Sequence, residues 1–110
     1  MTIETPTDHC VCLTTCDDAA RAEALAAALV ECGAAACVTV LPGARSFYRW
    51  QGEVHGDAEW LLMIKIRRAD YPRLERELLA RHSYDVPELL ALPVLTGAPD
   101  YLAWLDAPDA

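Results

Sequence analysis

The sequence predicts an α+β fold, in which four strands and two helices follow one another in split βαβ order and a further helix is added at the C-terminus. Short apolar, β-branched runs typical of strands alternate with stretches that have the 3.6-residue period of amphipathic helices. A length of 110 residues also suits one hydrophobic core rather than two. We therefore expect a single domain over residues 8–110, after a flexible lead-in over residues 1–7.

The first strand and the first helix are expected within residues 8–33. Residues 8–16 have the apolar, β-branched composition of a buried strand. Asp17 and Asp18 follow as candidate N-caps, and Gly33 ends the helical pattern. The apolar side chains that recur at helical spacing between them are Ala22, Leu25, Ala26, Leu29 and Val30.

Residues 34–67 are expected to form an unusually long β-hairpin that reverses at Gln51 and Gly52. Each arm of about sixteen residues would reach roughly 50 Å, whereas a compact chain of this length has a radius of gyration of about 13 Å. The outer half must therefore overhang, and Pro42 with Gly43 indicates an edge or bulge that bends the first arm outward. The aromatic residues assigned to the tip are Phe47, Tyr48, Trp50 and Trp60.

Both faces of the second arm are apolar, with Leu62 and Ile64 on one face and Leu61 and Met63 on the other. Two helices can cover only one face of a four-stranded sheet, so the opposite face needs another cover. This pattern and the overhanging aromatic hairpin both favour self-association.

The remaining elements complete the predicted order. Asp70 is the expected N-cap of a second helix, and a proline-containing edge strand is expected over residues 86–95. A short terminal helix opens at Pro99. The expected inner stripe of the second helix is Tyr71, Leu74 and Leu78, with Leu79 as a further candidate. The terminal helix places Tyr101, Trp104 and Leu105 on one side. Strand, helix, strand, strand, helix, strand is the ferredoxin-like order.

Composition narrows the range of partners and compartments. The net charge is −8 and Lys65 is the only lysine, which disfavours a nucleic-acid partner because tracking phosphates requires clustered basic side chains. No apolar run is long enough for a membrane span and no signal-peptide pattern opens the chain, so we expect a cytoplasmic protein without a membrane partner. The five cysteines are then expected to be free thiols.

Several segments of the chain resemble the signature segments of the CutA proteins, a family linked to divalent-cation tolerance. The resemblance extends from about His9 to Asp106. The segments are residues 36–38 (Ala-Cys-Val), 41–43 (Leu-Pro-Gly), 46–52 (Ser-Phe-Tyr-Arg-Trp-Gln-Gly), 59–65 (Glu-Trp-Leu-Leu-Met-Ile-Lys), 84–94 (Tyr-Asp-Val-Pro-Glu-Leu-Leu-Ala-Leu-Pro-Val) and 101–105 (Tyr-Leu-Ala-Trp-Leu).

The resemblance implies a tight homotrimer of ferredoxin-like subunits, with sheets packed around a threefold axis and the hairpin reaching a neighbour. It also implies an architecture like that of PII signalling proteins, and a role in metal tolerance with copper or another divalent metal ion bound. We expect no metal to be required for folding. A PII-like sensor of a small ligand, or a scaffold for an unknown protein partner, is the alternative function.

Two residues are candidate metal ligands through the resemblance. Cys37 stands in the Ala-Cys-Val segment, and its thiolate would suit Cu(I) or Zn(II). His82 lies just before the segment that opens at Tyr84, where the family tends to place a histidine. The alternative for Cys37 is a buried small apolar side chain, and for His82 a surface histidine.

Cys10, Cys12 and Cys16 share a parity, so a regular strand would place all three thiols on one face. This could be a soft-metal site, but the spacing is not that of a zinc knuckle or ribbon. We favour structural thiols.

Six residues form a candidate cleft between subunits, since these positions line such a cleft in the resembled family. They are Trp50, Glu59, Lys65, Tyr84, Glu88 and Trp104. Lys65 lies in an apolar strand, and a buried ammonium needs a partner, which Glu59 or Glu88 could supply. Aromatic walls around opposed charges suit a ligand pocket, although an interface salt bridge would give the same pattern.

No enzymatic motif is present. The sequence has no Gly-x-Gly-x-x-Gly, no phosphate loop, no nucleophile elbow and no His-Glu-x-x-His. We therefore expect a protein that is not an enzyme.

Overall fold

A computed structural model describes residues 5–109 of the chain. Residues 1–4 of the predicted lead-in, and Ala110, lie outside this range. The elements are β1 (His9–Cys16), α1 (Ala19–Glu31), β2 (Cys37–Trp50), β3 (Glu53–Arg67), a single 3-10 turn (Arg68–Asp70), α2 (Tyr71–Arg81), β4 (Leu90–Pro93) and α3 (Pro99–Asp106). The strands form one antiparallel sheet in the order β2-β3-β1-β4, which confirms the ferredoxin-like α+β fold.

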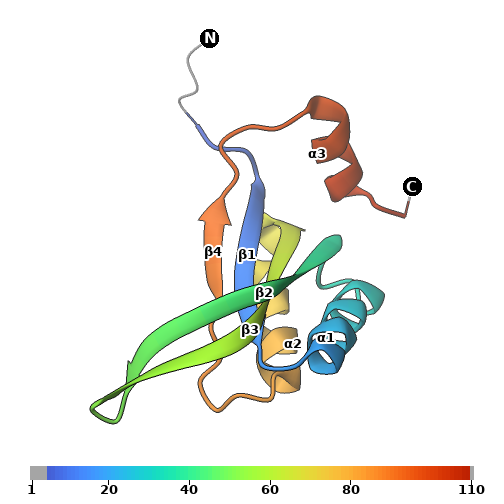
Figure 1. Ribbon diagram of the computed structural model, residues 1–110. Coiled ribbons are helices and arrows are strands. Elements are labelled where there is room, and N and C mark those ends of the chain that lie inside the picture. The colour runs from blue at the N-terminus through green and yellow to red at the C-terminus, as the bar shows by residue number, and fades with distance from the viewer. Residues whose placement is uncertain (1–4, 110) are drawn as a thin grey trace.

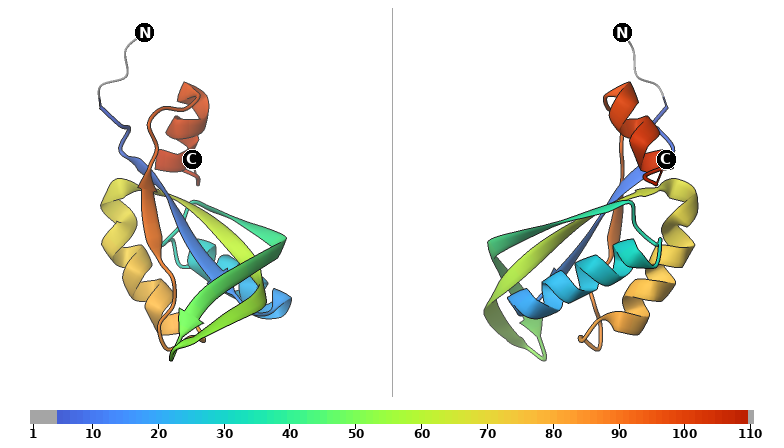
Figure 2. Two further views of the ribbon diagram at one scale, coloured as in Figure 1. Left: turned by 60° about the vertical axis from the view of Figure 1, so that its left-hand side comes forward. Right: turned by 90° about the vertical axis from the view of Figure 1, so that its right-hand side faces the viewer.

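The helices α1 and α2 pack on one face of the sheet and enclose the core with it (Figures 1 and 2). Asp18 caps α1 as predicted, since its carboxylate accepts hydrogen bonds from the backbone N–H groups of Ala20 and Arg21. The largest fully buried side chains come from β1, β3 and both helices. They are Cys12, Thr14, Leu29, Leu62, Ile64, Ile66, Leu74 and Leu78.

The hairpin overhangs the domain as predicted. β1 pairs with β3 only from Cys16 opposite Trp60 to His9 opposite Arg67, so the outer half of the hairpin has no third strand beside it. The longest dimension of the molecule is 46 Å and its radius of gyration is 15.1 Å, larger than the value for a compact chain. The predicted bulge is present between Leu41 and Ala44, where Gly43 has a φ of +86°.

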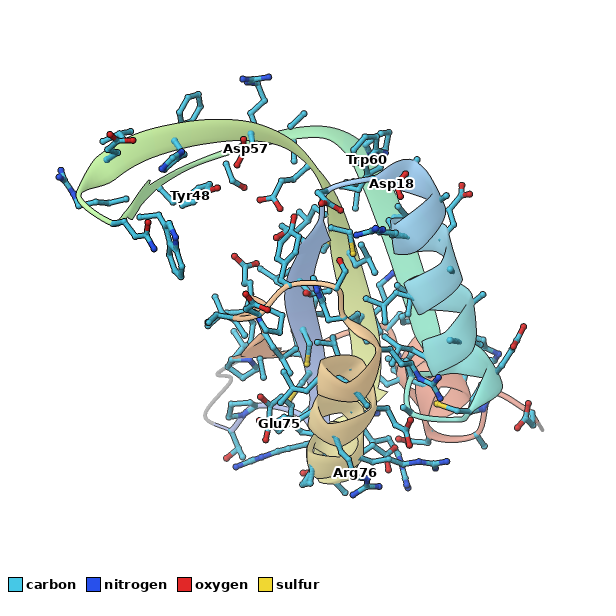
Figure 3. The ribbon with its side chains drawn as sticks, turned by 90° about the horizontal axis from the view of Figure 1, so that it is seen from below. Asp18, Tyr48, Asp57, Trp60, Glu75 and Arg76 are labelled. Carbon is cyan, nitrogen blue, oxygen red and sulfur yellow. The ribbon has the colours of Figure 1, made fainter. Side chains whose placement is uncertain are left out.

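The position of Trp60 corrects one prediction. Trp60 is not at the hairpin tip, because it pairs with Cys16 in the body of the sheet and packs against the core. Figure 3 shows it beside the N-terminal end of α1.

Helix boundaries and faces also differ from the prediction in places. Asp70 does not cap α2, since its carboxylate instead accepts two hydrogen bonds from the Arg67 guanidinium. Val30 and Leu79 are exposed rather than inward-facing. The predicted strand over residues 86–95 is only four residues long, and it is an edge strand as expected.

The face of the sheet opposite the helices has no covering layer within residues 5–109 (Figure 2). We call it the open face. Its apolar side chains are Val11, Leu13, Leu61 and Met63, which are half-buried, with Leu90 and Leu92, which are exposed. α3 does not cover this face near the hairpin, because it lies at the opposite end of the molecule from the hairpin tip (Figure 1).

Candidate functional site

A groove of about 1100 Å³ lies between the overhanging hairpin and the loop that connects α2 to β4. The hairpin forms one wall with residues from both arms, and residues 83–88 of the loop form the other. The hairpin arches over this space, and Tyr48 and Asp57 lie on its concave side (Figure 3). Four of the six predicted cleft residues line the groove, namely Trp50, Glu59, Tyr84 and Glu88.

Glu59 and Tyr84 meet in the floor of the groove. The Tyr84 hydroxyl donates a hydrogen bond of 2.6 Å to Oε2 of Glu59, whose residue is only 8% exposed. Burial, then this hydrogen bond and the charge of Glu59, raise the pKa of Tyr84, so the phenol stays protonated and remains a donor. The Glu59 carboxyl therefore has a neutral donor on Oε2 in a largely buried position.

Glu88 adds a second carboxyl close to Glu59. Burial, and then the negative charge of Glu59, raise the pKa of Glu88 above its ordinary value. Titratable groups perturbed by burial and by a like charge inside a groove are typical of functional sites.

A second pair of the same kind lies further out along the hairpin. The Tyr48 hydroxyl donates a 2.5 Å hydrogen bond to Oδ2 of Asp57, and this bond raises the pKa of Tyr48. The sequence pattern places Tyr48 at the hairpin tip, but neither Tyr48 nor Asp57 is among the predicted cleft residues. Asp57 and Glu59 are two residues apart on β3, so their side chains lie on the same face of the hairpin. On β2, the bulge before Ala44 shifts the register and so changes which side chains lie on that face.

Lys65 does not join the groove. Its ammonium donates a 2.8 Å hydrogen bond to Oγ1 of Thr39 and lies 3.9 Å from Sγ of Cys37 on the neighbouring strand. Within residues 5–109 of one subunit, Lys65 forms no ion pair with Glu59 or Glu88, so such a pair across a subunit interface stays a prediction. Trp104 also lies elsewhere, on α3, where its ring stacks on Tyr101.

The candidate metal ligands Cys37 and His82 are far apart within one subunit. Cys37 pairs with Lys65, whereas His82 contacts the strand end at Cys16, which pairs with Trp60. The two β3 positions, Lys65 and Trp60, are five residues apart, which corresponds to roughly 16 Å along the strand. The two side chains cannot share one ion inside a subunit.

Both ring nitrogens of His82 already have partners. Nδ1 accepts a 3.1 Å hydrogen bond from the Tyr84 backbone N–H, so the neutral ring carries its proton on Nε2. Nε2 lies 2.8 Å from the carbonyl oxygen of Thr15 and donates a hydrogen bond to it. His82 thus fixes the loop that forms one wall of the groove, and could bind a metal only by giving up one of these bonds.

The three thiols of β1 are buried on the helix-facing side of the sheet. Burial raises the pKa of Cys12 to about 12 and that of Cys16 to about 11, so both remain neutral thiols near pH 7. Their placement in the core fits the structural role that we favoured. Nowhere in residues 5–109 do three or more His, Cys, Asp or Glu side chains converge as they would around a metal ion.

Comparison with known proteins gives the family. The model of the CutA1 divalent ion tolerance protein family matches residues 10–108. The chain belongs to this family. It is 47% identical over 100 residues to the divalent-cation tolerance protein CutA of Pectobacterium atrosepticum, covering 91% of each chain. The crystal structure of CutA from Xylella fastidiosa is similar with a TM-score of 0.88 and 40% identity, over 91% of this CutA chain and 96% of that one.

Relatives occur in more than one compartment. A CutA protein of Arabidopsis thaliana, 46% identical over 74% of this chain and 44% of its own length, is described as chloroplastic. A similar structure from Archaeoglobus fulgidus, with a TM-score of 0.86 and 32% identity over 89% of this chain and 95% of that one, is described as periplasmic. No helix within residues 5–109 is long and apolar enough to span a membrane.

Proposed function

We propose that this CutA protein acts in the cytoplasm as a homotrimer in the response to divalent cations, and that the trimer binds copper or another divalent metal ion. The observation that carries the proposal is membership of a family whose members are named for divalent-cation tolerance. The open face and the overhanging hairpin support the trimer, since both leave apolar surface that a neighbouring subunit would bury. The relatives' names describe tolerance proteins, and we propose no catalytic activity.

The ligands of such a metal ion would have to come from more than one subunit. Cys37 is one soft donor on the open face, and a thiolate alone is too few ligands for tight binding. A threefold assembly multiplies each donor, so the open face is where repeated thiols could meet.

Calorimetric titration of the protein with Cu(I), Cu(II) and Zn(II) tests the metal part of the proposal. We expect binding with a Kd below about 100 μM that Cys37→Ala weakens. The matched control is Cys32→Ala, which removes a half-buried thiol on the helix side of the sheet. Absence of binding at that concentration would reject the metal part while leaving the trimer untouched.

The groove supports a second candidate function, that of a PII-like sensor that binds a small ligand and relays its presence to a protein partner. The observation that favours it is the nearly buried Glu59 beside Tyr84 and Glu88 in an aromatic groove. A thermal-shift screen of small metabolites tests it. We expect at least one compound to stabilise the protein, and Tyr84→Phe to reduce that shift. A screen without any such compound would leave the trimer as a scaffold for a partner.

A further inference from the structure

The lining of the groove has one sign of charge. It includes five carboxyl groups, and none of its residues is Lys, Arg or His. The five are Asp17, Asp57, Glu59, Asp85 and Glu88. A cleft lined by one sign of charge concentrates ions of the opposite sign, so this groove attracts cations.

Among these five carboxyl groups, that of Glu59 is notable for its burial and its lack of a basic partner in the part of the chain that the structure describes. More than nine-tenths of the residue is buried, yet no basic side chain within residues 5–109 forms an ion pair with it. Its one hydrogen-bond donor in this range is the neutral Tyr84 hydroxyl on Oε2, which leaves Oε1 free to accept another. A buried carboxylate without a counter-ion is costly, and a bound cation would relieve that cost.

A second carboxylate stands at a suitable distance along the same strand. Asp57 and Glu59 are two residues apart on β3, which places them on one face and roughly 7 Å apart. Oδ2 of Asp57 accepts the Tyr48 hydroxyl just as Oε2 of Glu59 accepts that of Tyr84. Each negative charge therefore lies beside an aromatic ring.

This arrangement suits an organic cation better than a metal ion. Ca²⁺ and Mg²⁺ need several oxygens converging at about 2.0–2.6 Å, and no group of three or more His, Cys, Asp or Glu within residues 5–109 converges in this way. An alkylammonium group needs only one carboxylate and aromatic faces within about 6 Å. A chain of methylene groups can then lie along the tyrosine rings between the two charges.

We propose that the groove binds a short aliphatic diamine or polyamine, with one ammonium group at Glu59, a second at Asp57 and the hydrocarbon chain against Tyr48 and Tyr84. This inference rests on the second proposed function, the ligand-binding groove, and names the chemical class of its ligand. Two charges on the ligand match two separated carboxylates, so a diamine binds more tightly than a monoamine of the same length.

Calorimetric titration of the assembled protein at low ionic strength tests the proposal with three four-carbon probes. They are 1,4-diaminobutane, butylamine and 1,4-butanediol. We expect the diamine to bind at least tenfold more tightly than butylamine and the diol not to bind. Mg²⁺ at the same ionic strength should not displace the diamine. Equal binding of diamine and butylamine, or displacement by Mg²⁺, would overturn the proposal.

Variants locate the binding. Glu59→Gln and Asp57→Asn should each weaken diamine binding at least tenfold. The matched control is Glu75→Gln, because Glu75 also accepts a tyrosine hydroxyl, that of Tyr71, but lies on α2 outside the groove. If Glu59→Gln fails to fold, Asp57→Asn decides, since Asp57 is exposed. Unchanged binding in Asp57→Asn would overturn the proposal.

The same experiments separate this inference from the function on which it rests. If the diamine fails but another compound gives a thermal shift that Tyr84→Phe reduces, the groove is a ligand site and only the ligand class is wrong. If no compound binds, both are wrong.

Discussion

At the scale of single residues, the groove depends on one hydroxyl group. The Tyr84 hydroxyl is the donor that stabilises the buried Glu59 carboxylate. Tyr84→Phe removes this donor without changing the shape of the ring. We expect it to lower the free energy of unfolding by roughly 1–3 kcal/mol per subunit, because a buried acceptor is then left unsatisfied.

Tyr71→Phe is the matched control for this prediction. It removes a hydroxyl that donates to Glu75 on the exposed surface of α2, where water can replace it. We expect an effect within about 0.5 kcal/mol. Urea denaturation at one fixed protein concentration measures both variants, and equal losses would contradict a special role for Tyr84.

Glu88 makes stability depend on pH. Its pKa in the folded protein is raised by burial and by Glu59, so the unfolded chain loses this proton first as the pH rises. Ionisation of Glu88 therefore destabilises the fold progressively from the ordinary glutamate pKa up to the raised one, and fully above it. Below the ordinary value the carboxyl is protonated in both states and has no effect.

Glu88→Gln should remove this penalty. Because Glu88 is exposed and screened by solvent, the expected gain at pH 7 is no more than about 1 kcal/mol. The gain should vanish near pH 3.5, below the ordinary glutamate pKa. Thermal unfolding of both proteins across this range measures it, and a difference that does not change with pH would refute the assignment.

At the scale of elements, a single side chain caps the N-terminus of α1. Asp18 accepts hydrogen bonds from Ala20 N–H at 3.1 Å and from Arg21 N–H at 3.4 Å, whereas Asp17 makes no capping bond. Asp18→Ala should destabilise the protein by about 1 kcal/mol. Asp17→Ala, one residue earlier, should have a smaller effect on the denaturation midpoint. A larger loss for Asp17→Ala would mean that the cap has been assigned to the wrong residue.

The elements also show how much of the fold the sequence could predict. Periodicity and turn residues predicted every helix and strand in the right order, because local patterns determine them. Boundaries that depend on tertiary contacts were less accurate. The last strand was predicted over residues 86–95, yet β4 spans only Leu90–Pro93, and residues 83–88 before it form a wall of the groove instead.

The same limit applies to the site. Glu59, Tyr84 and Glu88, which were assigned to one cleft, line one groove within a subunit, whereas Lys65 lies outside this groove because its partners depend on strand register. Cys37 lies directly opposite Lys65 and Thr39 lies two residues further along β2, so the ammonium reaches these rather than a distant carboxylate. The register of β2 against β3 cannot be read from the local sequence pattern of either strand.

At the scale of the whole molecule, the two unusual surfaces adjoin each other. Glu59, Leu61 and Met63 share a parity on β3, so the concave side of the hairpin continues into the open face. A neighbour that covers the open face would therefore also approach the groove. In such an assembly, ligand binding in the groove and contact between subunits would affect one another.

The trimer itself can be tested through the open face. Met63 is half-buried at the middle of this face, and Met63→Asp would place a charge in the proposed interface. We expect the wild-type protein to have a solution mass about three times the 12.1 kDa of one chain by light scattering at micromolar concentration, and Met63→Asp to dissociate. Leu79→Asp is the control, because Leu79 is already half-exposed on α2, and this substitution should leave the mass unchanged.

Since unfolding of an obligate trimer is linked to dissociation, the wild-type melting temperature should also fall on dilution. A folded wild-type monomer would show that this surface stays exposed to water and would reject the trimer.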